Sequence, residues 1–140
     1  MKYILDSSVA FKWVVAEALS DKAQLVRDDY RNQVHELLSP DVFPLEIAHA
    51  LTRAERQGRI TVSQSAVLLA DVLSTSPRLF SYFPLLPRAV EISSRLRVGV
   101  YDCLYVALTE QEGGELLTAD ARLASLKTTF PFITELSSLP

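Results

Sequence analysis

The stretch that decides the fold is Tyr3-Ile4-Leu5-Asp6-Ser7-Ser8, close to the start of the sequence. Its three apolar residues fit a short strand buried on both faces, as in a parallel sheet covered by helices. An acid follows where burial should end, and the two serines are good caps for a helix that begins at Val9. We therefore expect Asp6 at the carboxyl end of a strand, which is the edge where open α/β sheets bind ligands.

Length and composition indicate one ordinary globular domain over residues 1–140, with 49% hydrophobic and 22% charged residues. We see no export leader and no apolar run long enough to span a bilayer, and a lone cysteine cannot form an intramolecular disulfide. We therefore expect a cytoplasmic protein, with Cys103 as a core residue. The net charge of −3 disfavours simple electrostatic binding of nucleic acid, but two divalent cations held by carboxylates would reverse its sign.

The remaining sequence alternates between strand-like and helix-like segments. The expected strands cover residues 3–5, 37–39, 79–83, 116–118 and 132–134. The expected helices cover residues 9–16, 20–30, 44–57, 87–96, 101–112 and 120–127. In the first of these helices Lys12 interrupts the apolar run Val9–Ala16, and we expect it to be exposed. A further helix follows a capping box at 61–64 and is expected to bury Val62, Ala66, Leu69 and Leu73. Strands that alternate with helices predict a parallel sheet covered by helices.

Four acids are expected at one edge of this sheet. Asp6 and Asp120 follow the first and fourth strands, and parallel strands place their carboxyl ends at the same edge. Glu46 lies in the first turns of the helix after the second strand, and Asp102 starts the helix that leads into the fourth. Each acid has a simpler explanation: Asp102 complements a helix dipole, Glu46 is solvated, and Asp120 caps a helix.

The four acids taken together favour a metal site. Like charges gathered in one place repel, so they must take up protons or be neutralised by a cation. Carboxylate oxygens without a histidine or cysteine set suit Mg²⁺ or Mn²⁺ rather than zinc. Metals held by acids at a strand edge serve phosphoryl chemistry, so the pattern predicts a metal-dependent phosphodiesterase.

Four blocks of sequence carry a family resemblance: residues 4–8, 45–48, 100–108 and 117–123. Their order and spacing resemble PIN-domain ribonucleases and, within that family, the VapC-type toxins of bacterial toxin–antitoxin systems. The most specific part is the pair of blocks around Tyr101-Asp102 and Thr118-Ala119-Asp120. The resemblance implies a PIN-like three-layer α/β fold, with a five-stranded parallel sheet in the order 3-2-1-4-5 flanked by helices.

The resemblance also implies roles for individual residues. The catalytic, metal-binding acids would be Asp6, Glu46, Asp102 and Asp120. Ser8 and Thr118 would orient carboxylates or water, although a helix cap and a strand-end hydroxyl explain these two residues equally well.

Several residues are candidates for contact with RNA. His49 stands one turn after Glu46, where these toxins often carry asparagine, and it either contacts the scissile phosphate or simply packs. Arg53, one further turn along the same helix, is a candidate for binding an RNA phosphate. Trp13, Tyr101 and Tyr105 are candidates for stacking on bases, but apolar surroundings favour a core or interface position for Trp13 and Tyr105.

The expected function is that of a Mg²⁺- or Mn²⁺-dependent endoribonuclease, a toxin that inhibits translation. By resemblance, its partners would be RNA, a small antitoxin protein and a second copy of the chain, with no membrane. Two alternatives stay open: a PIN nuclease that processes RNA without being a toxin, and a PIN module that binds RNA or protein without cutting. Haloacid-dehalogenase-type phosphatases fit worse, because they need an aspartate where this chain has Ser8. Receiver domains also fit worse, because they need a further acid and a lysine that are missing here.

Overall fold

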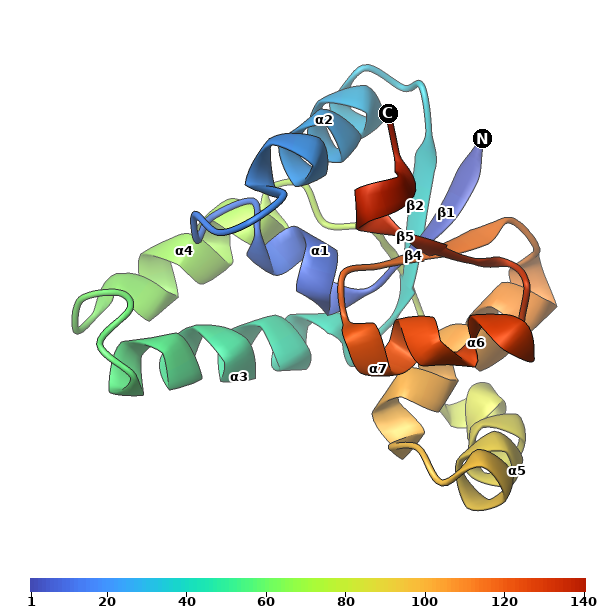
Figure 1. Ribbon diagram of the computed structural model, residues 1–140. Coiled ribbons are helices and arrows are strands. Elements are labelled where there is room, and N and C mark those ends of the chain that lie inside the picture. Colours follow the sequence, from blue (N-terminus) through green and yellow to red (C-terminus); the bar gives the residue numbers. More distant parts are fainter.

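Five parallel strands form one sheet in the order β3-β2-β1-β4-β5 (Figure 1). The computed structural model describes residues 1–140. The strands are β1 (Lys2–Leu5), β2 (Glu36–Pro40), β3 (Arg78–Phe80), β4 (Glu115–Thr118) and β5 (Ile133–Glu135). The predicted fold class and strand order are therefore confirmed.

Helices cover both faces of the sheet and make three layers. They are α1 (Ser7–Phe11), α2 (Ser20–Arg31), α3 (Phe43–Arg56), α4 (Gln64–Leu73), α5 (Leu86–Leu96), α6 (Val100–Glu112) and α7 (Ala121–Ala124). Three 3₁₀ turns cover Phe83–Leu85, Ser125–Thr128 and Leu136–Ser138. Successive residues of β1 serve opposite faces, as strand geometry requires. Tyr3 and Leu5 pack with α1 to α4, whereas Ile4 packs with α5, α6 and α7.

The central helix α6 is buried along most of its length, with every residue from Cys103 to Thr109 buried. A helix that is apolar all round belongs in the core of a fold. Burial, with a smaller contribution from the charge of Asp102, raises the pKa of the Cys103 thiol to about 11. Cys103 is thus the core residue that the sequence predicted. None of the helices combines the length and the apolar character needed to cross a membrane.

The first helix is shorter than predicted. It ends at Phe11 rather than near residue 16, and Asp6 occupies its N-cap position in place of the serines. The chain then turns, so that the Lys12 side chain is only 12% exposed and its ammonium pairs with Glu17 at 3.0 Å. The expectation that Lys12 is exposed was wrong, because the early end of the helix turns it towards the protein.

The predicted buried face of α4 was wrong for Val62, Ala66 and Leu73, which are exposed, and right for Leu69, which packs against the core. The Gln64 side chain accepts a hydrogen bond from the backbone N–H of Thr61, which is half of the expected capping box. The helix itself starts only at Gln64, after Ser63 adopts a left-handed φ of 75°. Val62 therefore lies outside the helix and is 82% exposed. The residues that α4 packs against the core are Leu68, Leu69 and Val72.

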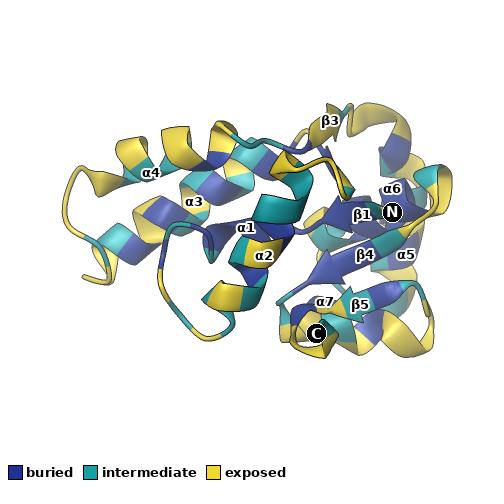
Figure 2. Ribbon diagram, turned by 90° about the horizontal axis from the view of Figure 1, so that it is seen from above, coloured by how far each residue is buried: buried dark blue, intermediate teal, exposed yellow.

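The helical hairpin of α3 and α4 extends away from the sheet, and its outer side is exposed (Figure 2). Beyond it, β3 is shorter than the predicted strand 79–83 and ends at Phe80. The chain then enters a 3₁₀ turn that contains Pro84, a residue that cannot donate to a strand ladder. Phe83 consequently lies on the surface and is 72% exposed.

Candidate active site

Asp6 lies at the carboxyl end of β1 and is only 4% exposed. Its backbone N–H donates to the carbonyl of Leu117 at 3.0 Å, which fixes it against β4. The hydroxyls of Ser8 and Thr118 both donate to the same carboxylate oxygen, Oδ2. Burial raises the pKa of Asp6, and these hydrogen bonds oppose that rise. Ser8 also accepts from the N–H of Ala119 at 3.0 Å, so it joins β1 to the end of β4.

Glu46 enters the same region from the first turn of α3. The hydroxyl of Tyr105, a fully buried residue of α6, donates to its Oε1 at 2.6 Å. Burial raises the pKa of Glu46 to about 7; the Tyr105 hydrogen bond opposes this rise, and the charges of Asp6 and Asp102 add to it. The support of Glu46 by Tyr105 was not predicted, although the position of Tyr105 three residues after Asp102 places both on one face of α6.

Asp102 and Asp120 complete the set. Asp102 lies in the first turn of α6, and burial raises its pKa to about 6, with added repulsion from Asp6 and Asp120. Asp120 caps α7, where its Oδ1 accepts the N–H of Arg122 at 2.9 Å. Asp120 is therefore a helix cap, as the simpler explanation has it. Its side chain nevertheless lies at the carboxyl edge of the sheet, together with the other acids.

All four acids line one cavity of about 290 Å³ at the carboxyl ends of the strands. Two cationic side chains, Lys12 and Arg122, line it as well. Lys12 is held by Glu17, whose other oxygen pairs with Arg59 at 2.7 Å. The sequence missed Lys12 because the turn after α1 could not be foreseen. The structure thus brings together acids that are far apart in the sequence.

The donor set suits a hard divalent cation. Carboxylate oxygens are the only strong ligands that line the cavity, and Mg²⁺ and Mn²⁺ prefer such ligands. No three acid, histidine or cysteine side chains stand close enough together to hold one ion. The fit therefore rests on donor chemistry and on charge. Burial and repulsion raise the pKa values of Asp6, Glu46 and Asp102, and a bound cation would offset that repulsion.

Some of the candidate RNA-binding residues line cavities at the acid site, and others do not. His49 lines a cavity of about 540 Å³ beside Glu46, and Tyr101 lines both this cavity and a third one of about 480 Å³. Arg53 is exposed on α3 and lines none of these three cavities. Trp13 is buried, and its indole N–H donates to the carbonyl of Ala23. Trp13 and Tyr105 are therefore core residues that cannot stack on bases.

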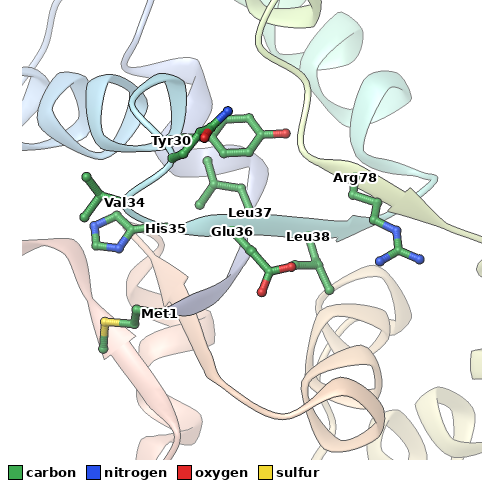
Figure 3. A pocket seen from close by; sticks show the side chains of 9 residues that line it. Met1, Tyr30, Val34, His35, Glu36, Leu37, Leu38 and Arg78 are labelled. Atoms are coloured by element: carbon green, nitrogen blue, oxygen red, sulfur yellow. The ribbon is translucent and has the colours of Figure 1, made fainter.

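Another hollow, of about 380 Å³, lies at the opposite end of the sheet, where β2 begins (Figure 3). Tyr30, His35 and Arg78 are among the side chains around it. His35 contacts Asp29 at 3.2 Å and stands edge-on to the ring of Tyr3. None of the predicted site residues lies here, so the acid-lined cavity is the candidate active site.

Comparison with known proteins defines the class. The family profile described as the PIN domain matches residues 3–128, so the chain belongs to the PIN-domain family. The chain is also 31% identical over 126 residues to Ribonuclease VapC3 of Pyrobaculum aerophilum, covering 89% of this chain and 93% of that protein. The crystal structure of PAE2754 from the same organism superposes with a TM-score of 0.70 at 21% identity, covering 99% of this chain and 94% of that one. The first comparison confirms the predicted family, the second the resemblance to VapC-type ribonucleases, and the third the fold.

Proposed function

We propose that this protein is an endoribonuclease that hydrolyses RNA phosphodiester bonds with the help of Mg²⁺ or Mn²⁺. The observation that carries the proposal is the cavity lined by Asp6, Glu46, Asp102 and Asp120 in a chain of the PIN-domain family. A protein 31% identical to this chain is named a ribonuclease, which supports RNA as the substrate.

In this proposal the four acids hold the metal, and neighbouring groups fix the acids. A divalent cation supplies Lewis acidity there: it lowers the pKa of water and offsets the charge that develops during hydrolysis. Ser8 and Thr118 hold one oxygen of Asp6, and Tyr105 holds one oxygen of Glu46. These hydrogen bonds limit how far the carboxylates of Asp6 and Glu46 would have to turn when a cation binds, which is the advantage of a preorganised site.

Cationic groups at the rim would receive the substrate. Lys12 and Arg122 line the acid cavity, and Arg97 and Arg122 line the adjoining cavity beside Tyr101. Basic side chains bind the phosphates of a nucleic acid and set its position on a protein. We place the RNA backbone along this rim, so that one phosphodiester reaches the acids.

We further propose that the nuclease is the toxin of a toxin–antitoxin pair and inhibits translation in the cytoplasm. Its partners would be a small antitoxin protein that covers the acid cavity and a second copy of the chain in a homodimer. This part of the proposal is supported by the relative that carries the VapC name. Expression of the chain alone should arrest growth, and co-expression of the antitoxin should restore it.

The direct test is cleavage of total RNA by purified protein with Mg²⁺ or Mn²⁺, compared with a chelator. Asp102→Asn should abolish cleavage, because it removes a charged ligand while nearly keeping the side-chain volume. Glu36→Gln is the matched control: Glu36 is exposed at the opposite end of the sheet and should not affect cleavage.

Three outcomes separate this proposal from its alternatives. If Asp102→Asn cleaves RNA as fast as the wild-type protein does, the four acids are not the catalytic site. RNA binding without cleavage at any metal concentration would favour a non-cutting PIN module. Cleavage combined with harmless expression in cells would favour a nuclease that processes RNA and is not a toxin.

A further inference from the structure

A second hollow opens directly beside the acid cavity. It has a volume of about 540 Å³ and is lined by Ser7, Leu45, Glu46, His49 and Tyr101. Ser7 and Glu46 also line the acid cavity, so the two spaces adjoin along these residues. A substrate held at the acids would thus have a neighbouring group within reach of this hollow.

The walls of the hollow present apolar surface to solvent. Tyr101 is 51% exposed and immediately precedes Asp102, and Leu45 is 64% exposed and immediately precedes Glu46. Covering such surface releases free energy in proportion to the area removed from water. The fold leaves these two side chains open, whereas it buries Tyr105 on the same helix completely. The first turns of α3 and α6 therefore position both apolar side chains together with the acids Glu46 and Asp102.

The remaining walls carry groups that can form hydrogen bonds. Ser7 contributes a hydroxyl, Glu46 a carboxylate and His49 an imidazole ring from the same helix as Glu46. A pocket with an aromatic surface and a few polar groups at its edge fits a flat, polar-edged ring. A nucleobase has this form, and in RNA it hangs from the backbone whose phosphates would reach the acids.

We propose that this hollow, which we call the base pocket, receives the nucleobase adjacent to the scissile phosphodiester, with Tyr101 as its stacking surface. The inference rests on the proposed function, because it places a base next to a phosphodiester held at Asp6, Glu46 and Asp102. Only an unpaired base can enter such a pocket, since a base in a duplex is stacked and paired. Such a base is available in single strands and in loops.

Tyr101 also lines a cavity that is rich in arginine. This cavity, of about 480 Å³, is lined by Arg97 and Arg122 as well. Arginines in this place suit phosphates, which are contacted without regard to sequence. Tyr101 thus lines both a pocket suited to a base and a cavity suited to the backbone.

The test combines a protein substitution with a missing base. Tyr101→Ala should lower kcat/KM on single-stranded RNA by about 5- to 150-fold, the range expected for loss of one stacked base. Tyr101→Phe keeps the ring and should stay close to wild type. Phe83→Ala is the control, because Phe83 is an exposed aromatic residue that lines none of the three cavities.

An abasic residue is then placed at each position of an oligoribonucleotide around the cut. For the wild-type enzyme, cleavage should slow when the abasic residue stands at one position next to the cleaved bond. For Tyr101→Ala, the abasic residue at that position should slow cleavage no further, because the two changes remove the same contact and their losses are not additive. If the wild-type enzyme cleaves RNA, and the effects of Tyr101→Ala and of the abasic residue add at every position, the base pocket is wrong and the proposed function stands.

A binding measurement separates the two proposals. The probe is single-stranded RNA that carries 2-aminopurine beside the mapped cut, or at each position in turn if no cut occurs. Its fluorescence should fall on binding the wild-type protein but not on binding Tyr101→Ala. If wild type cuts no RNA but quenches the probe and Tyr101→Ala does not, the nuclease proposal fails, and what stands is a base-binding pocket at Tyr101 without a scissile bond beside it. If no probe position is quenched by wild type, the base pocket is wrong, whatever the cleavage result.

Discussion

Replacing Asp102 with asparagine should stabilise the metal-free protein even though it destroys the proposed site. The pKa of Asp102 is about 6 in the folded protein, against an ordinary value of 3.8, because burial and the charges of Asp6 and Asp120 disfavour its ionised form. Between these two pH values the folded chain keeps a proton that the unfolded chain has lost. Stability therefore falls as the pH rises through this window, and the full cost is present above it.

The magnitude follows from the gap between the two pKa values. A gap of about 2 pH units corresponds to about 3 kcal/mol at most. Water screens a carboxylate that is partly exposed, so we expect a gain of about 1–2 kcal/mol from Asp102→Asn near neutral pH. For a domain of this size, such a gain corresponds to a rise of about 3–8 °C in Tm.

The assay is thermal unfolding with a chelator, at about pH 8 and again at a pH near 4, where the gain should shrink because Asp102 is largely protonated in the folded state. Adding Mg²⁺ or Mn²⁺ at high pH should raise the Tm of wild type but not that of Asp102→Asn, since only a native-state ligand stabilises the fold. Glu36→Gln controls for loss of a surface charge. A Tm of Asp102→Asn below that of wild type at high pH with chelator would refute the argument from burial and repulsion.

Two further substitutions test the supports of the acids. Tyr105→Phe removes the hydroxyl that donates to Glu46 and should raise the pKa of Glu46 above about 7 by up to about 1 pH unit, measured by carbon-13 NMR titration of the metal-free protein. An unchanged titration would mean that this hydrogen bond does not stabilise the ionised carboxylate. Asp120→Asn should keep the stability of the α7 cap, whereas Asp120→Ala should cost about 1 kcal/mol in urea unfolding. Both should weaken metal binding, and normal metal affinity in Asp120→Asn would limit Asp120 to its capping role.

The sequence was sufficient to predict the sheet because its signals are local or topological. Buried strands such as Tyr3-Ile4-Leu5 are recognised in the sequence as continuous apolar runs. Because parallel strands end at the same edge of a sheet, the acids that follow them are then expected to lie close together. Asp6 directly follows β1 and Asp120 lies two residues past β4, so their placement needed only the strand assignment. Glu46 and Asp102 needed one more step, the direction of the helices that carry them.

What the sequence did not predict depends on contacts between distant segments. The hydrogen bond from Tyr105 to Glu46 joins residues 59 apart in the chain, and no pattern within either helix specifies it. The buried face of α4 depends on where its first turn begins, and the left-handed conformation of Ser63 sets that point. Lys12 looked like a solvated interruption of an apolar run, and only its pairing with Glu17 shows otherwise.

The four acids differ in what offsets their charge, and that difference indicates how the site works. Asp6 has two hydroxyl donors, Glu46 has a phenol, and Asp120 has a backbone N–H at a helix cap. For Asp102 only the charge of Arg122 lowers the pKa, while burial and the charges of Asp6 and Asp120 raise it. Three carboxylates are thus held by contacts of the fold, and under the proposed function the fourth would be neutralised by the cation. Such a site would lose stability when empty and regain it on binding, so we expect metal affinity and fold stability to be coupled most strongly through Asp102.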